Sequence, residues 1–272
     1  MEIVKLDDLA KNIRKDIITV SYLHKVPHLG SCLSIVDILT VLYFKYLNIS
    51  SDNLNSENRD RFILSKGHAV PALYQVLKAK SILTSDELKD YGSDGSYFAE
   101  HPPASGIDGI EAATGSLGHG LPIGLGISLS LDIKELDAKT VVLLGDGECN
   151  EGSVWEAAMM ASSNKTKNLI AIIDFNKWQA TDRSKEVLSL DPLSDKWESF
   201  GWEVYECDGN DTKSLIKVLD KIFNSDEKKP KVLIAHTVKG KGISFMEDDN
   251  NWHYRTPNKE EYENAMLEME ID

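Results

Sequence analysis

The sequence contains little of what marks an extracellular or membrane protein. Among 272 residues there are three cysteines, Cys32, Cys149 and Cys207, an odd number at wide spacing. They form neither a disulfide framework nor a zinc-binding pattern, so we expect a chain that works in a reducing compartment, the cytoplasm. No run of 18 uninterrupted apolar residues occurs, and the first 20 residues are charged throughout. We therefore expect neither a membrane span nor a signal peptide.

Positive charge is also scarce. The chain has 30 lysines and arginines against 44 aspartates and glutamates, which gives a formal net charge of −14. This excess argues against nucleic acid or an anionic membrane as the main partner, because both are themselves negatively charged. A phosphorylated ligand stays compatible with the sequence, since a local site can be positive inside an acidic protein. The phosphate-binding patterns GxGxxG and GxxxxGKS are both absent, which argues against an unrelated nucleotide-binding protein.

What the chain does contain is a regular alternation of apolar strand-like runs with amphipathic segments. Aliphatic and β-branched runs predict strands at 61–64, 140–144, 169–174, 202–207 and 231–235. Helices are predicted at 1–20, 35–46, 69–81, 121–131 and about 258–270. This alternation predicts an α/β fold, a mainly parallel sheet with helices on both faces. We see no repeat or low-complexity linker, so we expect one domain over 1–272, with its core at about 21–255.

One predicted strand ends in a way that suggests a ligand site. In LLGDGECNEG, at 143–152, a buried-type strand stops on Asp146 between Gly145 and Gly147. The carboxyl end of a strand, ahead of a helix, is where open α/β sheets bind ligands. A plain strand-to-helix turn explains the same residues, so both interpretations stay open at this point. The inner face predicted for the following helix consists of Trp155, Ala158, Met159 and Ala161.

A second strand also ends in polar residues. LIAIIDFNKWQ, at 169–179, places Asn176 thirty residues after Asp146. If the two strands are parallel neighbours, a carboxylate and an amide oxygen meet at one edge of the sheet. Both suit Mg²⁺, which takes its remaining ligands from water and phosphate, so the pair indicates a diphosphate ligand bridged by metal. For Asn176 taken alone, turn chemistry is the simpler explanation.

The two stretches together, GDG followed after about thirty residues by Asn, resemble the thiamine diphosphate signature. Four further segments resemble the transketolase family, in the family's order, from about Ser21 to His253: HLGSCLS, DRFILSKGH, EHPPASGIDGIEAATGSLGHG and GDGECNEGSVWEAA. The resemblance covers only half of a full transketolase, which continues into a pyrimidine-binding domain and a C-terminal domain. It implies the N-terminal, diphosphate-binding subunit of a split transketolase, with the fold of a thiamine diphosphate-binding domain.

The resemblance also implies how the cofactor is held. The metal ligands would be Asp146, Asn176 and the backbone carbonyl of Trp178, with Mg²⁺ or another divalent cation such as Ca²⁺ or Mn²⁺. The cofactor, thiamine diphosphate, supplies the reactive carbon, and the protein supplies binding and orientation. Glu151 matches a family glutamate that contacts the partner's pyrimidine domain, although helix-terminal charge explains it too. The implied cofactor-binding positions are His68, Gly115, Leu117, Gly147, Glu151 and Asn176.

Four histidines match the family's active-site cluster, and the resemblance implies catalytic roles for His28, His68, His101 and His253. His28 and His253 would contact the hydroxyl at C3 of a ketose, and His101 the C1 hydroxyl or C2 oxygen. His68 would lie between the diphosphate and the substrate. Histidine suits proton movement between hydroxyls because its pKa lies near neutrality.

Other residues near these motifs are less clearly assigned. His253 stands in WHYRTPN, where the family often has WHG, so Tyr254 could shift that loop. We interpret His24 and His236 as structural, and leave the role of His119 open.

The implied function is transfer of a two-carbon ketol unit from a ketose to an aldose-type acceptor, with sugar or sugar-phosphate substrates. Because the glutamate that activates the cofactor belongs to the missing half, the resemblance implies an obligate partner with a pyrimidine-binding domain, in an α2β2 assembly. The α subunit of a 2-oxo acid dehydrogenase or a deoxyxylulose phosphate synthase fragment would share GDG and the Asn, but would need no such histidine cluster. A non-catalytic thiamine diphosphate sensor or scaffold is the alternative of a different class.

Overall fold

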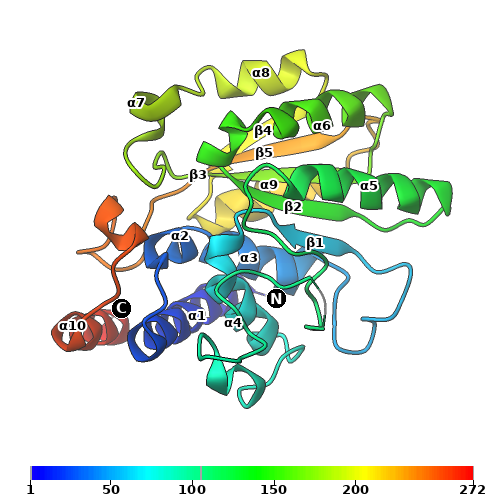
Figure 1. Ribbon diagram of the computed structural model, residues 1–272. Coiled ribbons are helices and arrows are strands. Elements are labelled where there is room, and N and C mark those ends of the chain that lie inside the picture. The colour runs from blue at the N-terminus through cyan, green and yellow to red at the C-terminus, as the bar shows by residue number, and fades with distance from the viewer. Residues whose placement is uncertain (1, 105, 272) are drawn as a thin grey trace.

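The computed structural model describes residues 2–104 and 106–271 (Figure 1). Within them, five parallel strands form one sheet in the order β1-β2-β3-β5-β4. The strands are β1 (Arg61–Leu64), β2 (Thr140–Gly145), β3 (Leu169–Phe175), β4 (Glu203–Asp208) and β5 (Lys231–His236). Each predicted strand boundary lies within one residue of the observed one, and the predicted parallel sheet is confirmed.

Helices cover both faces of the sheet, as predicted (Figure 1). One face carries α1 (Ile3–His24), α3 (Val36–Val41), α4 (Val70–Ala79) and α9 (Thr212–Phe223). The other carries α5 (Gly120–Ile133), α6 (Gly152–Ser163) and α8 (Leu193–Ser199). The remaining helical segments are α2 (Leu29–Leu33), α7 (Ser184–Leu188), α10 (Lys259–Ile271), the π-helical η1 (Leu42–Tyr46) and the short 3₁₀ turns η2 (Gly67–Ala69), η3 (Glu87–Asp90), η4 (Gly147–Asn150) and η5 (Asn250–His253).

The sheet separates two apolar cores, which explains why its central strands are almost wholly apolar, whereas the edge strand β4 carries Glu203, Glu206 and Asp208. Along β2, Val141 and Leu143 face one core while Val142 and Leu144 face the other. Successive strand residues point to opposite faces, so a strand covered on both sides needs an apolar residue at every position. The sheet is therefore packed between helices on both faces, and the loops at its carboxyl edge extend from this packed core.

The structure corrects two details of the helix predictions. The helix predicted over 35–46 is α3 followed by the π-helical η1. In α6 the inner face consists of Val154, Ala157, Ala158 and Ala161, whereas Met159 is 51% exposed. Met159 follows Ala158 directly, and one residue turns the side chain about 100° around a helix, away from the core.

The segment Leu29–Tyr46 has the length and the mean hydropathy, 1.4, of a membrane-spanning helix. Of this segment, 83% is buried inside the fold, where it forms α2, α3 and η1. Its apolar character is thus explained by packing in the core.

Candidate functional site

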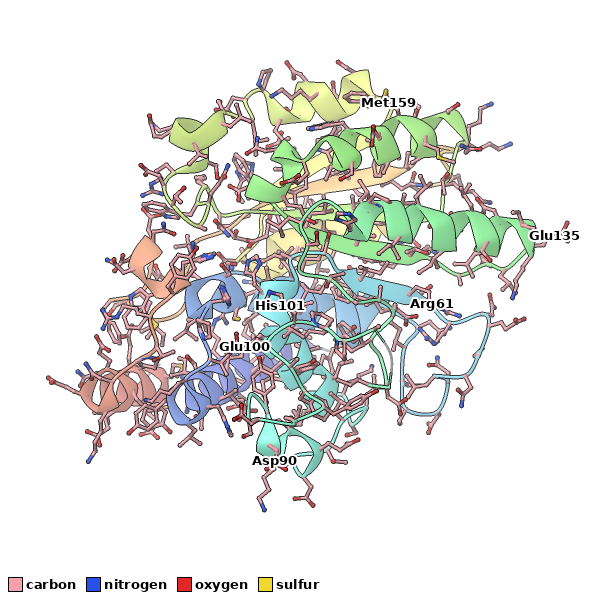
Figure 2. The ribbon with its side chains drawn as sticks, in the orientation of Figure 1. Arg61, Asp90, Glu100, His101, Glu135 and Met159 are labelled. Carbon is pink, nitrogen blue, oxygen red and sulfur yellow. The ribbon has the colours of Figure 1, made fainter. Side chains whose placement is uncertain are left out.

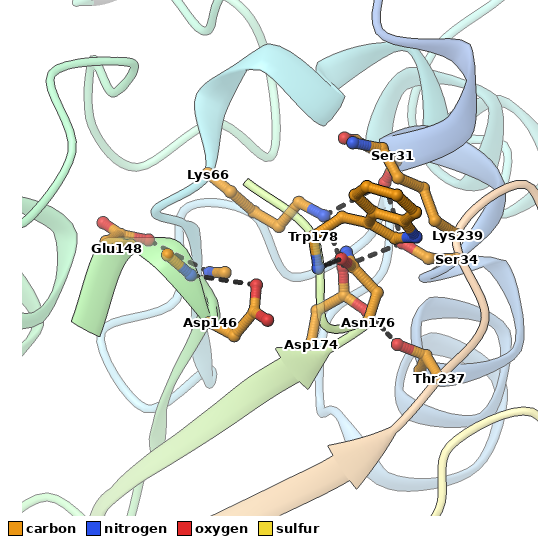
Figure 3. A network of polar contacts seen from close by, with 12 residues as sticks. Ser31, Ser34, Lys66, Asp146, Glu148, Asp174, Asn176, Trp178, Thr237 and Lys239 are labelled. Atoms are coloured by element: carbon orange, nitrogen blue, oxygen red, sulfur yellow. Dashed lines mark hydrogen bonds and ion pairs between the residues drawn. The ribbon is translucent and has the colours of Figure 1, made fainter. Parts of the chain in front are cut away.

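The two polar strand ends lie side by side at the carboxyl edge of the sheet. Gly145 of β2 pairs in register with Asp174 of β3, so Asp146 and Asn176 follow neighbouring strands. The Asp146 amide donates to the Asp174 carbonyl at 3.2 Å, and the Lys177 amide donates to Asp146 Oδ2 at 2.9 Å. Figure 3 shows Asp146, Asp174 and Asn176 together at this edge. The predicted meeting of carboxylate and amide is therefore observed.

Asp146 is a buried carboxylate with an oxygen that can still bind a cation. It is 1% exposed, and burial raises its pKa to about 6. Its Oδ2 accepts from Ser184 Oγ at 2.7 Å as well as from Lys177, whereas Oδ1 accepts from the Gly147 amide at 2.9 Å. Asn176 is 5% exposed and its Oδ1 accepts from the Trp178 amide at 3.0 Å. Each Oδ1 accepts this one hydrogen bond, and an oxygen of this kind has a second lone pair that can bind a cation.

Oxygen donors dominate this edge, which limits the metals that fit it. Among residues 2–104 and 106–271 no group of three or more His, Cys, Asp and Glu is arranged to hold a metal ion. A site made of one carboxylate, one amide oxygen and a backbone carbonyl is a poor zinc site. It fits a hard cation that keeps several waters or phosphate oxygens.

A buried ion pair between Lys66 and Asp174 lies next to Asn176. Lys66 Nζ lies 2.5 Å from Asp174 Oδ2, and the two side chains are 2% and 0% exposed. Asp174 also accepts hydrogen bonds from Asn176 Nδ2 at 2.8 Å, from Ser34 Oγ at 2.8 Å and from Thr237 Oγ1. Asp174 therefore fixes the orientation of the Asn176 amide, with Oδ1 directed away from it (Figure 3).

Among the residues that the structure describes, no carboxylate forms an ion pair with a second buried lysine, Lys239. Lys239 is 1% exposed, and its Nζ donates to Asn250 Oδ1 at 2.6 Å and to His253 Nδ1 at 3.1 Å. Burial, with Lys66 nearby, lowers its pKa to about 8, so it still carries a positive charge at neutral pH. A buried cation with only neutral partners favours an anionic ligand. Lys239 is therefore a local positive charge at which an anionic group of a ligand can bind, in a protein of negative net charge.

The four histidines predicted to form a cluster are brought together by four separate segments. The ring centroid of His28 lies 5.2 Å from that of His68, 6.2 Å from that of His101 and 5.1 Å from that of His253. The His28 amide donates to the His253 carbonyl at 2.9 Å, which ties the start of α2 to η5. His101 comes from the irregular loop between η3 and α5, near the middle of the molecule in Figure 2.

The environment of the cluster keeps three of its imidazoles, those of His28, His68 and His253, uncharged. Burial is the main cause that lowers the pKa of His28 to about 4 and that of His253 to about 3, and it holds the pKa of His68 well below its usual value. Neighbouring histidines and the two buried lysines add to the effect. Within the described residues, His28 Nδ1 is buried without a hydrogen-bond partner. Neutral rings that can each donate and accept suit a ligand rich in hydroxyl groups.

This pKa shift makes a stability prediction. The unfolded chain, with an ordinary histidine pKa, binds more protons than the folded chain between about pH 6.5 and pH 4. The contribution of neutral His28 is thus present above that window and is lost as pH falls through it. When the pH is lowered from 7 to 5, the free energy of unfolding should fall in both chains. We expect the fall to be about 1 kcal/mol smaller in His28→Asn than in the unsubstituted chain, after allowance for the partial exposure of His28. Urea unfolding at both pH values measures it. His119→Asn, at an exposed histidine, is the control, and identical losses for His28→Asn and the unsubstituted chain would contradict the prediction.

Close backbone packing sets the place of His101. Gly115 has a φ of +131°, and a Cβ there would lie 2.5 Å from His101 Cδ2. A Cβ on Gly67 would lie 2.6 Å from the Thr114 carbonyl carbon, so η2 and this loop touch through their backbones. Substitution of either glycine would push the loop away from His68 and His101.

Glu148 holds the same loop in place through hydrogen bonds. Its Oε1 accepts from Ser65 Oγ and from the Gly118 amide at 2.8 Å, and its Oε2 accepts from the Gly145 amide at 3.2 Å. Ser65 Oγ in turn accepts from the Gly120 amide at 3.1 Å. One buried carboxylate therefore joins the end of β1, the end of β2 and the start of α5.

We expect Glu148→Gln to lower the free energy of unfolding by about 1–3 kcal/mol, because the new amide group faces a backbone donor and leaves it unpaired. The amide of Gly118 or that of Gly145, whichever the new NH2 group faces, should exchange hydrogen faster in the variant. Denaturant unfolding and hydrogen exchange test this. Glu151→Gln, three residues on and exposed in the structure, is the control and should change neither quantity. Unchanged exchange at both Gly118 and Gly145 would exclude this role of Glu148.

The other residues that were predicted to bind the cofactor or the metal have the following surroundings. Leu117 is half-buried on the loop that carries Gly115, and Glu151 is exposed at the start of α6. Trp178 is half-buried, and its indole Nε1 donates to Asp248 Oδ1 at 2.8 Å. A Cβ on Gly147 would lie 2.8 Å from Gln179 Cγ, so this glycine permits close approach.

Three histidines lie outside the cluster. The ring of His24 packs 6.5 Å from that of Tyr91, and His236 Nε2 lies 2.7 Å from Glu206 Oε2. Both have structural partners, in agreement with their interpretation. His119 is exposed, with Nδ1 near the carbonyls of Ser116 and Leu117 at 3.1 and 3.2 Å.

The sequence reasoning missed four residues of this site: Lys66, Glu148, Asp174 and Lys239. A signal for the lysines exists, since SKGH and TVKGKG place each lysine beside glycine at the end of a strand. Asp174 looked like an ordinary strand residue, and Glu148 like an exposed helix-terminal charge. Only the fold shows that both are buried.

An open parallel sheet with a buried carboxylate, an oriented amide and two buried lysines at its carboxyl edge defines an α/β protein built for an anionic, metal-linked ligand. The histidine cluster beside it adds groups for a second, hydroxyl-bearing molecule.

Comparisons with known proteins agree with this class. Residues 8–268 match the family "Transketolase, thiamine diphosphate binding domain". The chain is 40% identical over 269 residues to an apulose-4-phosphate transketolase subunit of Phocaeicola vulgatus, covering 99% of this chain and 95% of that one. It is 36% identical over 245 residues to a 6-deoxy-6-sulfo-D-fructose transketolase subunit of a Clostridium species, covering 90% and 89%. The chain therefore belongs to the transketolase family, as a subunit of the split type.

Solved structures agree. The transketolase of Leishmania mexicana superposes with a TM-score of 0.89 at 25% identity, over 99% of this chain and 41% of that one. The transketolase of Campylobacter jejuni gives a TM-score of 0.89 at 26% identity, over 99% and 43%. Against human transketolase the identity is 35% over 250 residues, 91% of this chain and 39% of that one. The chain thus spans about two fifths of these single-chain enzymes.

Proposed function

We propose that this chain is the N-terminal subunit of a two-subunit transketolase that transfers a two-carbon ketol unit from a ketose to an aldose-type acceptor, with sugars or sugar phosphates as substrates. The observation that carries the proposal is the packing of four histidines, three of them held neutral, beside the carboxylate–amide edge. A metal-diphosphate site alone would fit many reactions. The histidine cluster adds what a polyhydroxylated substrate requires.

The residues present fit the cofactor. Asp146 and Asn176, with the backbone carbonyl of Trp178, would hold Mg²⁺ or a similar divalent cation through oxygens. Lys239, and the turn at Gly147, would face the diphosphate. Gly115, Leu117 and His68 would line the rings. Thiamine diphosphate, when bound, supplies the carbon nucleophile and electron sink that ketol transfer needs.

The histidines act on the sugar through hydrogen bonds. A neutral imidazole can accept a proton from a hydroxyl at one nitrogen while its other nitrogen donates, so His28 can take the C3 hydroxyl proton as the C2–C3 bond breaks, while His253 would donate a hydrogen bond to the same hydroxyl. The Lys239 ammonium, which donates to His253 Nδ1, leaves Nε2 of that ring as the donor side in its neutral form. His101 would hold the C1 hydroxyl or C2 oxygen. His68 would orient the reacting end between diphosphate and sugar.

We further propose that activity requires a partner chain that carries a pyrimidine-binding domain, arranged as α2β2, with Glu151 at the contact. Two relatives are themselves named as subunits of an apulose-4-phosphate transketolase, which supports a partner of some kind. We propose that the chain forms one domain and works in the cytoplasm.

The test is ketol transfer measured on the purified chain with thiamine diphosphate and Mg²⁺, alone and with the chain that co-purifies from the native cell. We expect at least about a 100-fold higher rate for the complex, because catalytic groups act as a unit. A normal rate for the chain alone would refute the partner requirement. Cofactor binding without any transfer, alone or in the complex, would instead favour a sensor or scaffold.

A further inference from the structure

A groove lies directly outside the histidine cluster, and of the residues assigned above Trp178 lines it. Its walls are the loop after Asn176, through Ala180 and Thr181, and the segment 248–255, and its volume is about 680 Å³. Asn250 ties the two walls together: its Nδ2 donates to the Ala180 carbonyl at 3.1 Å, and its Oδ1 accepts from Lys239 at 2.6 Å. The groove is therefore preorganised, which favours ligand binding.

Tyr254 stands at the border between this groove and the cluster. Its ring centroid lies 4.7 Å from that of His253 and 6.2 Å from that of His28, and the residue is 65% exposed. A sugar held by those two histidines would extend past this ring on its way into the groove. The ring offers a flat apolar surface, and its hydroxyl a polar tip.

Two arginines, Arg255 in the wall of the groove and Arg183 beside it, are already paired with carboxylates. Arg183 donates to both oxygens of Asp248, at 2.7 and 2.6 Å, and lies 3.7 Å above the Trp178 ring. Arg255 pairs with Glu261 and packs on Trp252. Neither arginine of these two pairs is left to neutralise a phosphate.

The polar groups that remain are of the kind that bind hydroxyls. Asp249 Oδ1 accepts from the amide and from Nδ2 of Asn251, both at 2.9 Å, which leaves Oδ2 as an acceptor. Thr181, exposed in the loop, adds a hydroxyl. An aromatic ring beside carboxylate and hydroxyl groups suits a sugar, whose C–H faces are apolar and whose hydroxyls both donate and accept.

We propose that this groove is the subsite for the uncharged, polyhydroxylated part of the sugar beyond the carbons that the histidines contact, and that Tyr254 determines specificity there by packing against the sugar chain. The proposal rests on the proposed function, since it names the substrate part that the same site would take. It assigns recognition of a phosphate to a surface other than this groove.

The first experiment uses the complex with its partner chain and compares a five-carbon aldose with glycolaldehyde as acceptor. We expect Tyr254→Ala to lower the ratio of kcat/KM for the long acceptor to that for the short one by about 10-fold. Tyr254→Phe should keep most of the ratio, since it keeps the ring. Ile133→Ala, at a residue 83% exposed at the end of α5, is the surface control. An unchanged ratio in Tyr254→Ala, with transfer intact, would overturn the subsite.

A second experiment does not depend on ketol transfer. Ribitol is titrated into the labelled complex, and the indole N–H of Trp178, which bonds Asp248 beside the groove, is followed by NMR. A saturable shift that is lost in Tyr254→Ala is expected. A shift that stays the same in the variant, or no shift, would overturn the proposal. If transfer is absent but ribitol binds through Tyr254, the proposed function fails while the polyol site stands.

Discussion

Replacement of Lys66 by methionine is expected to lower the free energy of unfolding by about 3–5 kcal/mol, because it leaves a buried carboxylate without its counter-charge. Asp174 is 0% exposed, and Lys66 Nζ lies 2.5 Å from it. Three neutral donors remain around Asp174 and cannot replace a full positive charge. Chemical denaturation of the unsubstituted and variant chains at pH 7 measures the effect.

Two variants make this prediction specific. Lys134→Met applies the same change to an ion pair with Glu57 whose side chains are 52% and 71% exposed. It should cost less than about 1 kcal/mol, since exposed pairs contribute little. In the double variant Lys66→Met with Asp174→Asn, part of the loss should return, because the buried charge is gone and an acceptor oxygen remains. If the two single lysine variants lose equal stability, the buried pair is not a structural requirement.

Asp146→Asn is expected to weaken the binding of thiamine diphosphate with Mg²⁺ by about 100-fold or more, since it removes the anionic ligand of the cation. The fold should survive, because an asparagine keeps one acceptor for the donors around Asp146. Calorimetry on the complex with the partner chain measures the affinity. Asp182→Asn, at an exposed acid in the neighbouring loop, is the matched control and should bind normally. Equal affinity in Asp146→Asn would remove Asp146 from the proposed metal site.

The pH dependence gives the same prediction a second readout. Burial raises the pKa of Asp146 to about 6, above its value in the unfolded chain. The stability from this group is present at low pH and is lost as pH rises through about 6, where the carboxylate becomes charged in the interior. A cation binds only the charged form, so cofactor-induced stabilisation should grow between pH 5 and pH 7. In Asp146→Asn this growth should disappear.

Both predictions concern charges buried at the carboxyl edge of the sheet. At the same edge the raised pKa of Asp146 and the lowered pKa of Lys239 show that the charge of each is unfavourable in the interior without a ligand. A divalent cation and a diphosphate would relieve both at once. The edge therefore has the electrostatic character of a site that gains stability from its ligand.

Most of the architecture could be predicted from the sequence, because the signals for it are local. Strands covered on both faces are apolar at most positions, so the runs were visible without the structure. The GDG turn and Asn176 could be paired because the ends of neighbouring parallel strands share one edge. The histidines were found by resemblance to the transketolase family, since nothing in their spacing along the chain, from His28 to His253, links them.

The burial of charged groups and the distances across the site depend instead on the tertiary structure. Glu148 and Asp174 look in sequence like many exposed acids. Only the packing of the fold buries them, so that Glu148 links three segments through hydrogen bonds and Asp174 pairs with Lys66. The burial of Lys239, the lowered pKa of three of the clustered histidines and the position of Tyr254 beside His253 likewise depend on segments far apart in the chain. Hydrophobic pattern specifies which face of an element is buried, whereas pKa and coordination depend on every neighbour in three dimensions.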